Sequence, residues 1–107
     1  MNAFPFIARK SFLRRRSHPI TIPRSYVNYQ QLEAEGLDRG PYFVIFPKGE
    51  QVSGRLRLGT NNWGPYYQLT VDVNGCEFPA YLNHEDSIFV LLTQIRGKNY
   101  AVLEYLE

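Results

Sequence analysis

Arginine and aromatic side chains recur together in the middle of the chain. Arg55 and Arg57 are two residues apart in a segment that alternates polar and apolar residues, and Trp63 follows in a glycine- and asparagine-rich loop. Tyr66 and Tyr81 lie in the segment after that loop. An exposed aromatic ring stacks on a nucleobase and a guanidinium neutralises a phosphate, so such a surface binds single strands with little sequence preference. The same residues are also compatible with plain cross-strand packing and with solubilising surface charge.

Residues that could catalyse a reaction are few. The only histidines are His18 and His84. The run Asn-His-Glu-Asp at 83–86 has the residue types of a metal or acid–base site, but it is more typical of a solvated turn. The sequence contains no nucleophile–base arrangement, phosphate-binding glycine loop or paired-cysteine spacing. We therefore expect a binding protein with no cofactor and no metal, and not an enzyme.

Residues 66–82 predict a β-hairpin that positions the two tyrosines. Asn74-Gly75 suits a two-residue type I′ turn, because both positions need a positive φ. Pairing outward from this turn places the apolar side chains, with Cys76 among them, on one face. Pro79 lacks an N–H, so strand 76–82 should be an edge or bulged strand. The polar face then carries Tyr66, Gln68, Thr70, Asp72, Glu77, Pro79 and Tyr81.

Further β-strands flank this hairpin. Residues 42–47 and 88–95 are continuous apolar runs, which predict strands covered on both faces. Residues 52–58 alternate, and 100–106 form the last strand after a turn. Five or six short strands predict a mainly β domain, a small OB-like and partly open barrel. Before it, Ser25 and Gly36 fit the two ends of one short helix.

The N-terminal segment concentrates positive charge. Residues 1–28 hold six basic and no acidic residues, whereas the rest of the chain holds six basic and ten acidic ones. This asymmetry indicates an arm that binds a polyanion. A cleaved organellar presequence, a membrane-surface segment, a solvated tail and a packing segment are the alternatives. The basic residues of the arm are Arg9, Lys10, Arg14, Arg15, Arg16 and Arg24.

Length and composition limit the remaining choices. A chain of 107 residues forms one domain with a modest core, which we divide into an arm (1–24), a short helix and linker (25–40) and a β-barrel (41–107). No apolar run is long enough to span a membrane. The single cysteine rules out an internal disulfide, and we expect a cytoplasmic protein.

The segment 58–82, LGTNNWGPYYQLTVDVNGCEFPAYL, resembles the single-stranded-DNA-binding (helix-destabilising) proteins of filamentous bacteriophages. Those OB-like proteins have a glycine-rich loop, a Pro-Tyr strand and a hairpin with an aromatic-proline pair. Gly59-Thr60, Gly64-Pro65-Tyr66 and Phe78-Pro79 match these elements, and the resemblance spans about residues 42–107. It implies a homodimer that coats single-stranded DNA cooperatively in the bacterial host cytoplasm. It also implies that Arg55, Arg57, Tyr66 and Tyr81 lie in the groove, with Trp63 on a wing.

Two other functions remain open. The chain could be a structural component of a large assembly, such as a ribosome-associated or virion protein, with a basic arm that threads into RNA. It could also be a phage or plasmid inhibitor that binds a host protein through the open edge near Pro79. Neither function leaves a chemical signature in a sequence.

Overall fold

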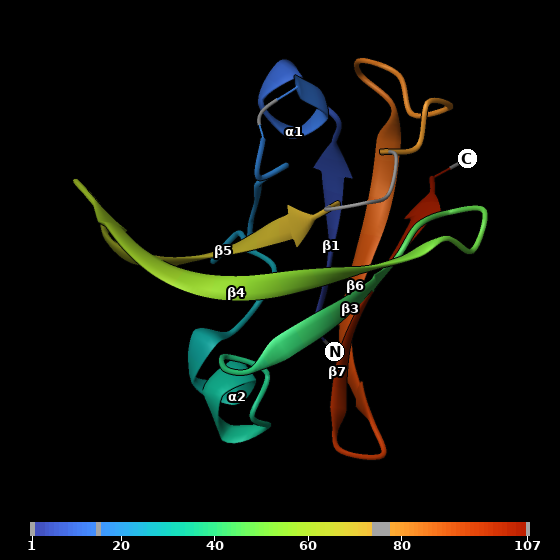
Figure 1. Cartoon of the computed structure of the whole chain (residues 1–107). Helices are drawn as coiled ribbons and strands as arrows, with labels where there is room; N and C mark the ends of the chain where they lie inside the picture. Colours follow the sequence, from blue (N-terminus) through green and yellow to red (C-terminus); the bar gives the residue numbers. More distant parts are fainter. Residues whose placement is uncertain (1, 15, 74–77, 107) are drawn as a thin grey trace.

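The computed structural model describes residues 2–14, 16–73 and 78–106, and these form one curved mixed sheet with two short helices (Figure 1). The sheet has seven strands in the order β1-β6-β7-β3-β4-β5-β2. The prediction of a mainly β protein is confirmed. The predicted five or six strands and single helix are wrong, because seven strands and two helices occur in the described residues. In chain order the elements are β1 (Ala3–Ile7), α1 (Lys10–Arg14), β2 (Ile20–Thr21), α2 (Tyr29–Ala34), β3 (Pro41–Ile45), β4 (Gln51–Asn61), β5 (Gly64–Asp72), β6 (Ser87–Ile95) and β7 (Lys98–Tyr105).

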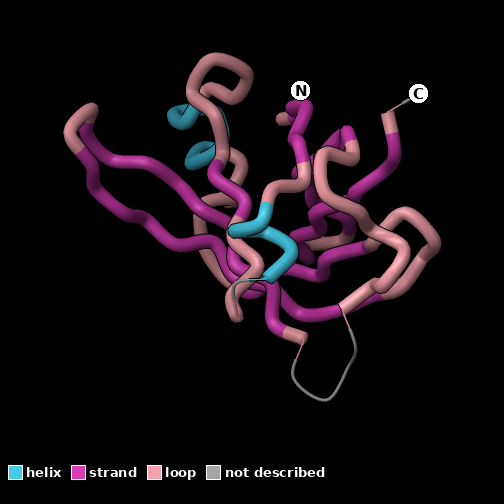
Figure 2. The backbone as a smooth tube through the Cα atoms, turned by 90° about the horizontal axis from the view of Figure 1, so that it is seen from above, coloured by secondary structure: helices cyan, strands magenta, loops and turns pink. Residues whose placement is uncertain are grey.

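The sheet is antiparallel except at one pair of neighbours. β3 runs parallel to β7, and the other neighbouring strands pair antiparallel. In the part of the chain described, β1 and β2 are the two edge strands and do not pair with each other, so the sheet is not closed. β4 and β5 extend beyond the rest of the molecule at the end where they are joined, as both views of the backbone show (Figures 1 and 2).

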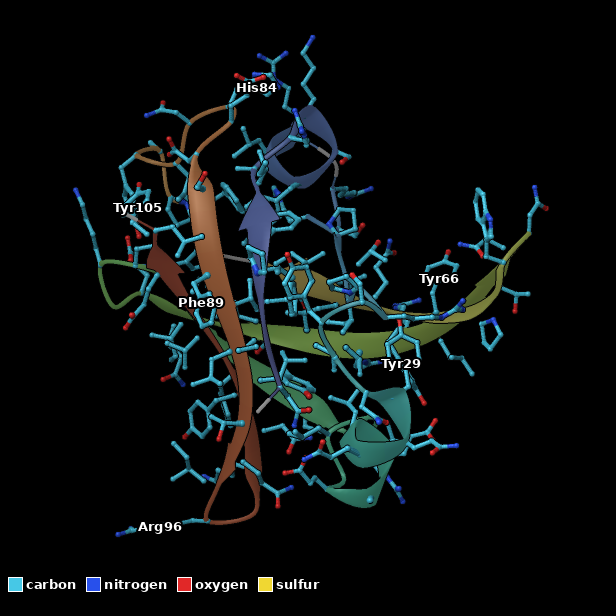
Figure 3. All side chains as sticks on the ribbon, turned by 180° about the vertical axis from the view of Figure 1, so that it is seen from behind. Tyr29, Tyr66, His84, Phe89, Arg96 and Tyr105 are labelled. Atoms are coloured by element: carbon cyan, nitrogen blue, oxygen red, sulfur yellow. The ribbon has the colours of Figure 1, made fainter. Side chains whose placement is uncertain are left out.

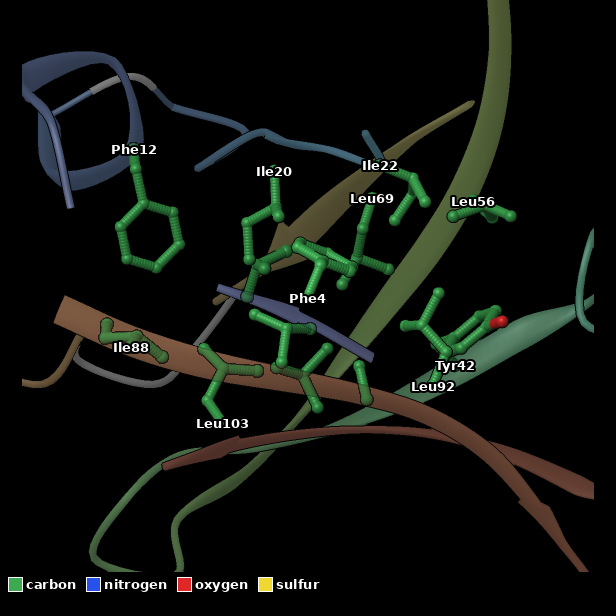
Figure 4. Close-up of a cluster of buried hydrophobic side chains, with 14 of the residues drawn as sticks. Phe4, Phe12, Ile20, Ile22, Tyr42, Leu56, Leu69, Ile88, Leu92 and Leu103 are labelled. Atoms are coloured by element: carbon green, nitrogen blue, oxygen red, sulfur yellow. The ribbon is translucent and has the colours of Figure 1, made fainter. Parts of the chain in front are cut away.

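The core fills the concave side of this sheet (Figure 4). Buried strand residues alternate with residues that are half-buried or exposed, as one-sided packing of a sheet requires. Phe12 of α1 and Leu32 of α2 are fully buried, and the two helices lie at opposite ends of the molecule in Figure 1. Burying each such side chain contributes about 1.5–3 kcal/mol. Strand residues that are at most 2% exposed include Phe4, Ile20, Tyr42, Val44, Leu69, Ile88, Leu92 and Leu103.

The N-terminal segment is part of the sheet. β1 pairs with β6, and β2 pairs with β5. The Val71 N–H donates to the Ser17 carbonyl at 2.7 Å, which fixes the chain just before β2. The residues expected to form an arm therefore supply both edge strands and one of the helices. Their charge indicated an arm, whereas their fold depends on buried apolar side chains such as Phe4 and Phe12.

The predicted pairing of 66–73 with 76–82 is wrong for the described residues. Residues 78–82 do not form a strand, and β2 occupies the edge of β5 that they were expected to fill. The Leu82 N–H donates to the Pro79 carbonyl at 3.4 Å, so this stretch turns instead. Phe78 contacts the rings of Phe12 and His18. An aromatic contact in the core thus replaces the expected strand pairing. The Asn74-Gly75 turn and Cys76 lie outside the described residues.

The short helix α2 begins later than expected. Asn28 caps it, because its Oδ1 accepts a hydrogen bond from the Gln31 N–H at 3.1 Å, so Ser25 is not the cap. The predicted end at Gly36 is confirmed. Gly36 has φ +75°, and the Leu37 N–H donates to the Leu32 carbonyl at 3.0 Å, which closes the helix as a glycine C-cap does.

Candidate nucleic-acid interface

The outer face of β4 and β5 carries two of the predicted arginines. Arg55 pairs across the strands with Thr70, and Arg57 pairs with Gln68. The alternate positions Leu56 and Leu69 are buried, so both arginine side chains stand on the solvent side, as the alternation predicts.

A groove of about 560 Å³ crosses this face and brings in a third arginine, Arg16. The hydrogen bond between the Val71 N–H and the Ser17 carbonyl places Arg16 at the edge of β5. Arg16, predicted as part of an arm, therefore lies beside Arg55 and Arg57. The groove is lined by Arg16, Ser17, Pro41, Ser53, Gly54, Arg55, Arg57, Thr70, Val71 and Asp72.

Three guanidinium groups line this groove together with one carboxylate, that of Asp72. In the described part of the chain, the ion pairs are Arg9 with Glu85 and Arg39 with Asp38, and none involves Arg16, Arg55 or Arg57. Like charges that converge on one site repel one another until an anion neutralises them. Three arginines and one aspartate leave the groove with a net positive charge, and the planar fork of arginine suits phosphate oxygens.

Tyr66 lies on the same outer face, one pair nearer the hairpin end. It pairs with Gly59, and a Cβ at position 59 would lie 2.6 Å from the Cζ of Tyr66. The ring therefore covers the glycine backbone, and it remains half-exposed (Figure 3). Because only glycine leaves room for the ring in this position, the pair holds one ring on the surface in a defined orientation.

Trp63 occupies the two-residue turn that joins β4 to β5. Its side chain is 81% exposed, the highest value among the exposed large apolar side chains described. The sequence analysis expected an irregular loop here. Instead the strands continue to the pair Asn61–Gly64, because Gly64 adopts φ +108° and the Asn61 Oδ1 accepts a hydrogen bond from the Trp63 N–H at 2.9 Å. The tryptophan therefore lies at the tip of the projecting hairpin.

Arg24 connects this tip to the body of the protein. Its Nη1 donates to the Trp63 carbonyl at 2.9 Å, and its guanidinium carbon lies 5.6 Å from the centre of the Tyr29 ring. The Tyr29 hydroxyl in turn accepts a hydrogen bond from the Tyr67 N–H at 3.2 Å. Arg24 thus supports the hairpin turn rather than lining the groove of Arg16, Arg55 and Arg57.

The other predicted site residues lie elsewhere. Lys10 and Arg14 border a separate hollow of about 460 Å³ that also includes His84. Arg9 lies 3.7 Å from Glu85 in an exposed ion pair. Arg15 lies outside the described residues.

Tyr81 is not brought to the groove. Its hydroxyl donates to Glu50 at 2.7 Å and its ring lies 4.5 Å from the Lys48 ammonium, beside the turn between β3 and β4. That turn is about 24 Å along β4 from Arg57 at the usual strand rise. Burial and the hydrogen bond to Glu50 raise the pKa of Tyr81 to about 12. Its contacts are those of a residue that fixes a turn.

The polar turn at 83–86 is closed by a hydrogen bond between its own residues. The Asp86 carboxylate accepts a hydrogen bond from the Asn83 N–H at 2.8 Å. Among the residues that the structure describes, no three histidine, cysteine or acidic side chains are grouped as a metal site.

Gln68 belongs to the candidate surface and Leu58 lies on the opposite side of the same hairpin; neither was singled out as a site residue. Leu58 is 63% exposed although it points to the inner side of the sheet, because the hairpin extends beyond the core there. Gln68 and Thr21 lie side by side on the outer face, where their side chains share a hydrogen bond of 3.2 Å. The polar run Gly59–Asn62 that follows Leu58 is the sequence signal for a strand that leaves the core.

No protein-family model matches the chain, and a search of curated proteins found no match. None of the helices in the described residues is long and apolar enough to cross a membrane.

Proposed function

We propose that the protein binds single-stranded nucleic acid along the outer face of β4 and β5. The observation that carries this proposal is the convergence of Arg16, Arg55 and Arg57 on one groove, whose lining includes the single carboxylate of Asp72, at the base of a hairpin that exposes Trp63. We further propose that the curved sheet serves as the binding platform, as the sheet of an OB-fold does.

The arginines supply the electrostatic part of the binding. Each guanidinium that contacts a phosphate releases counterions, so affinity falls as salt rises. Arg55 and Arg57 are one pleat repeat apart, about 7 Å, which suits contacts to successive phosphates of an extended strand. Lys10 and Arg14 form a second basic patch near α1 that is available to a longer strand.

The aromatic rings supply the stacking part. Tyr66 presents a half-exposed ring held over Gly59, and Trp63 presents an almost fully exposed ring at the tip. The stretch from Arg55 to Asn61 covers about 20 Å along the strand, enough for several nucleotides. Bases of a single strand are free to stack on such rings, whereas those of a duplex are already stacked within the helix. This difference is the reason for proposing a single-stranded ligand.

Fluorescence anisotropy with end-labelled oligonucleotides tests the proposal. We expect a single-stranded oligonucleotide to bind more tightly than a duplex of the same sequence, because only the single strand uses the aromatic rings. Equal and salt-sensitive affinity for both would mean that the arginines bind phosphates without stacking. No binding to either would contradict the proposal and favour a protein partner.

A further inference from the structure

The outer face of β3, β6 and β7 is apolar and is not covered. The continuous apolar runs of β3 and β6 predicted strands covered on both faces, yet in the described chain the outward apolar side chains of these strands are only half-buried or exposed. The solvated face of a sheet is usually polar. The apolar side chains on this face include Phe43, Ile45, Phe89, Leu91, Ile95, Tyr100 and Val102.

The exposed area is large for a monomer of this size. The chain exposes 6859 Å², whereas a folded monomer of its mass typically exposes roughly 6200 Å². The chain therefore exposes more surface than is typical of a folded monomer of its mass. One partner of a standard interface buries ~800 Å².

Opposite charges lie at the two ends of this face. Lys98 and Glu104 are both exposed and point outward from β7, six residues apart. Tyr100 and Val102 lie between them on the same side of the strand. The order along β7 is therefore cation, aromatic, aliphatic, carboxylate. When a second β7 runs in the opposite direction across it, each cation faces a carboxylate and each aromatic ring faces an aliphatic side chain.

We propose that a second copy of this chain covers this face. The two copies would be related by a two-fold axis that lies midway between the two sheets, runs perpendicular to the strands and passes beside Ala101 of β7. Reversing the strand about Ala101 places Lys98 opposite the partner's Glu104. It also places Tyr100 opposite the partner's Val102. Two-fold symmetry makes each of these contacts occur twice.

The same two-fold axis also places complementary side chains of the neighbouring strands opposite each other. In the observed register Phe89 pairs with Glu104 and Ile95 with Lys98, so the axis places Phe89 opposite the partner's Ile95. Ile95 is 53% exposed in the single chain, and the partner would cover it. On β3 the axis places Phe43 opposite the partner's Ile45. Each aromatic ring thus meets an aliphatic side chain, and this alternation of large and small groups lets two faces interlock.

The interface adjoins the groove, because Phe43 pairs with Ser53 of the groove lining, but it leaves the hairpin tip free. Phe89 and Tyr66 lie on opposite sides of the molecule in Figure 3, so two copies joined through β7 would keep both hairpins outside. The proposal concerns the protein without nucleic acid. It therefore stands or fails independently of the proposed function.

Sedimentation velocity over a concentration series of the protein alone tests the dimer, and charge reversal tests the register. We expect a monomer–dimer equilibrium for the unchanged chain. Lys98→Glu and Glu104→Lys should each weaken the dimer roughly tenfold, since each turns two attractive contacts into repulsive ones. The double variant Lys98→Glu/Glu104→Lys should restore the affinity. Ile95→Lys should also weaken it, because the partner would bury the new charge.

Arg57→Glu is the control, because it reverses a charge on the other surface. It should leave the dimer unchanged while it weakens nucleic-acid binding. A chain that stays monomeric at all concentrations overturns the proposal. A dimer whose affinity is unchanged by Lys98→Glu and Ile95→Lys, with circular dichroism showing an unchanged fold, also overturns it. A double variant that dimerises as weakly as the single variants overturns it as well.

Discussion

The clearest prediction concerns the salt dependence of binding when the groove loses its arginines. We consider the triple variant Arg16→Gln/Arg55→Gln/Arg57→Gln. These side chains are exposed and make no ion pair in the described chain, so the fold should keep its stability. Each phosphate contact on a single strand contributes about 0.7 to the slope of log affinity against log salt. Losing three contacts should therefore reduce the slope by about 2.

The size of the effect follows from that slope. Between 50 and 200 mM salt, the affinity of the unchanged protein should fall about 18-fold more than that of the triple variant. Fluorescence anisotropy with a labelled single-stranded oligonucleotide at four or more salt concentrations measures both slopes.

Arg96→Gln is the matched control for this experiment. Arg96 is an exposed arginine at the turn between β6 and β7, at the far end of the molecule from Tyr66 (Figure 3). Its replacement should leave the slope unchanged. An unchanged slope in the triple variant, or an equal loss on replacing Arg96, would refute the assignment of the groove as the phosphate site.

Three further predictions follow from the contacts of single residues. Trp63→Ala should weaken binding of a single strand by roughly 1–3 kcal/mol. The melting temperature should be unchanged, because the side chain is 81% exposed. An unchanged affinity in a titration would show that the hairpin tip is not part of the binding site. Gly59→Val should displace the Tyr66 ring, since a Cβ would lie 2.6 Å from its Cζ, and should therefore weaken binding of a single strand; an unchanged affinity by anisotropy would contradict a role for this ring. Burial and the hydrogen bond to Glu33 raise the pKa of Tyr67 to about 12 from 10.0, so its contribution to stability is complete below pH 10 and is lost as the pH rises to 12. Tyr67→Phe should therefore lose less stability over that range than the unchanged chain, and equal losses in urea unfolding at pH 9 and 11.5 would contradict this.

The polar face of the site could be predicted from the sequence because it depends on a period of two. Alternation in 52–58 assigns Arg55 and Arg57 to one side and Leu56 to the other without knowledge of the neighbouring strand. The same rule assigns Tyr66 to the outer face. The register between β4 and β5 confirms that these residues share a surface.

The edge of β5 could not be predicted in this way. The local signal at Asn74-Gly75 favoured pairing with residues 76–82, but Ile20 and Thr21, some fifty positions earlier, form the neighbouring strand. Competition between a near and a distant segment is decided by which one buries more apolar surface. Ile20 is fully buried, whereas residues near Pro79 contribute Phe78 to an aromatic cluster without forming a strand.

The N-terminal segment shows the same limit. Its six basic residues dominate the charge, and charge alone indicated an arm. Phe4, Phe12 and Ile20 alternate with those charges and fill the core. Only the three-dimensional partners of these side chains distinguish a folded segment from a solvated one, and those partners lie in β5 and β6.

The most direct test of the central claim is a titration with oligo-dT followed by the fluorescence of Trp63, the single tryptophan of the chain. Stacking of a base on the exposed indole should quench its emission, so we expect strong, saturable quenching by the single strand and a weak response to duplex DNA. Equal responses to both, or binding of oligo-dT without any change in emission, would contradict a surface on which bases stack beside the arginine groove.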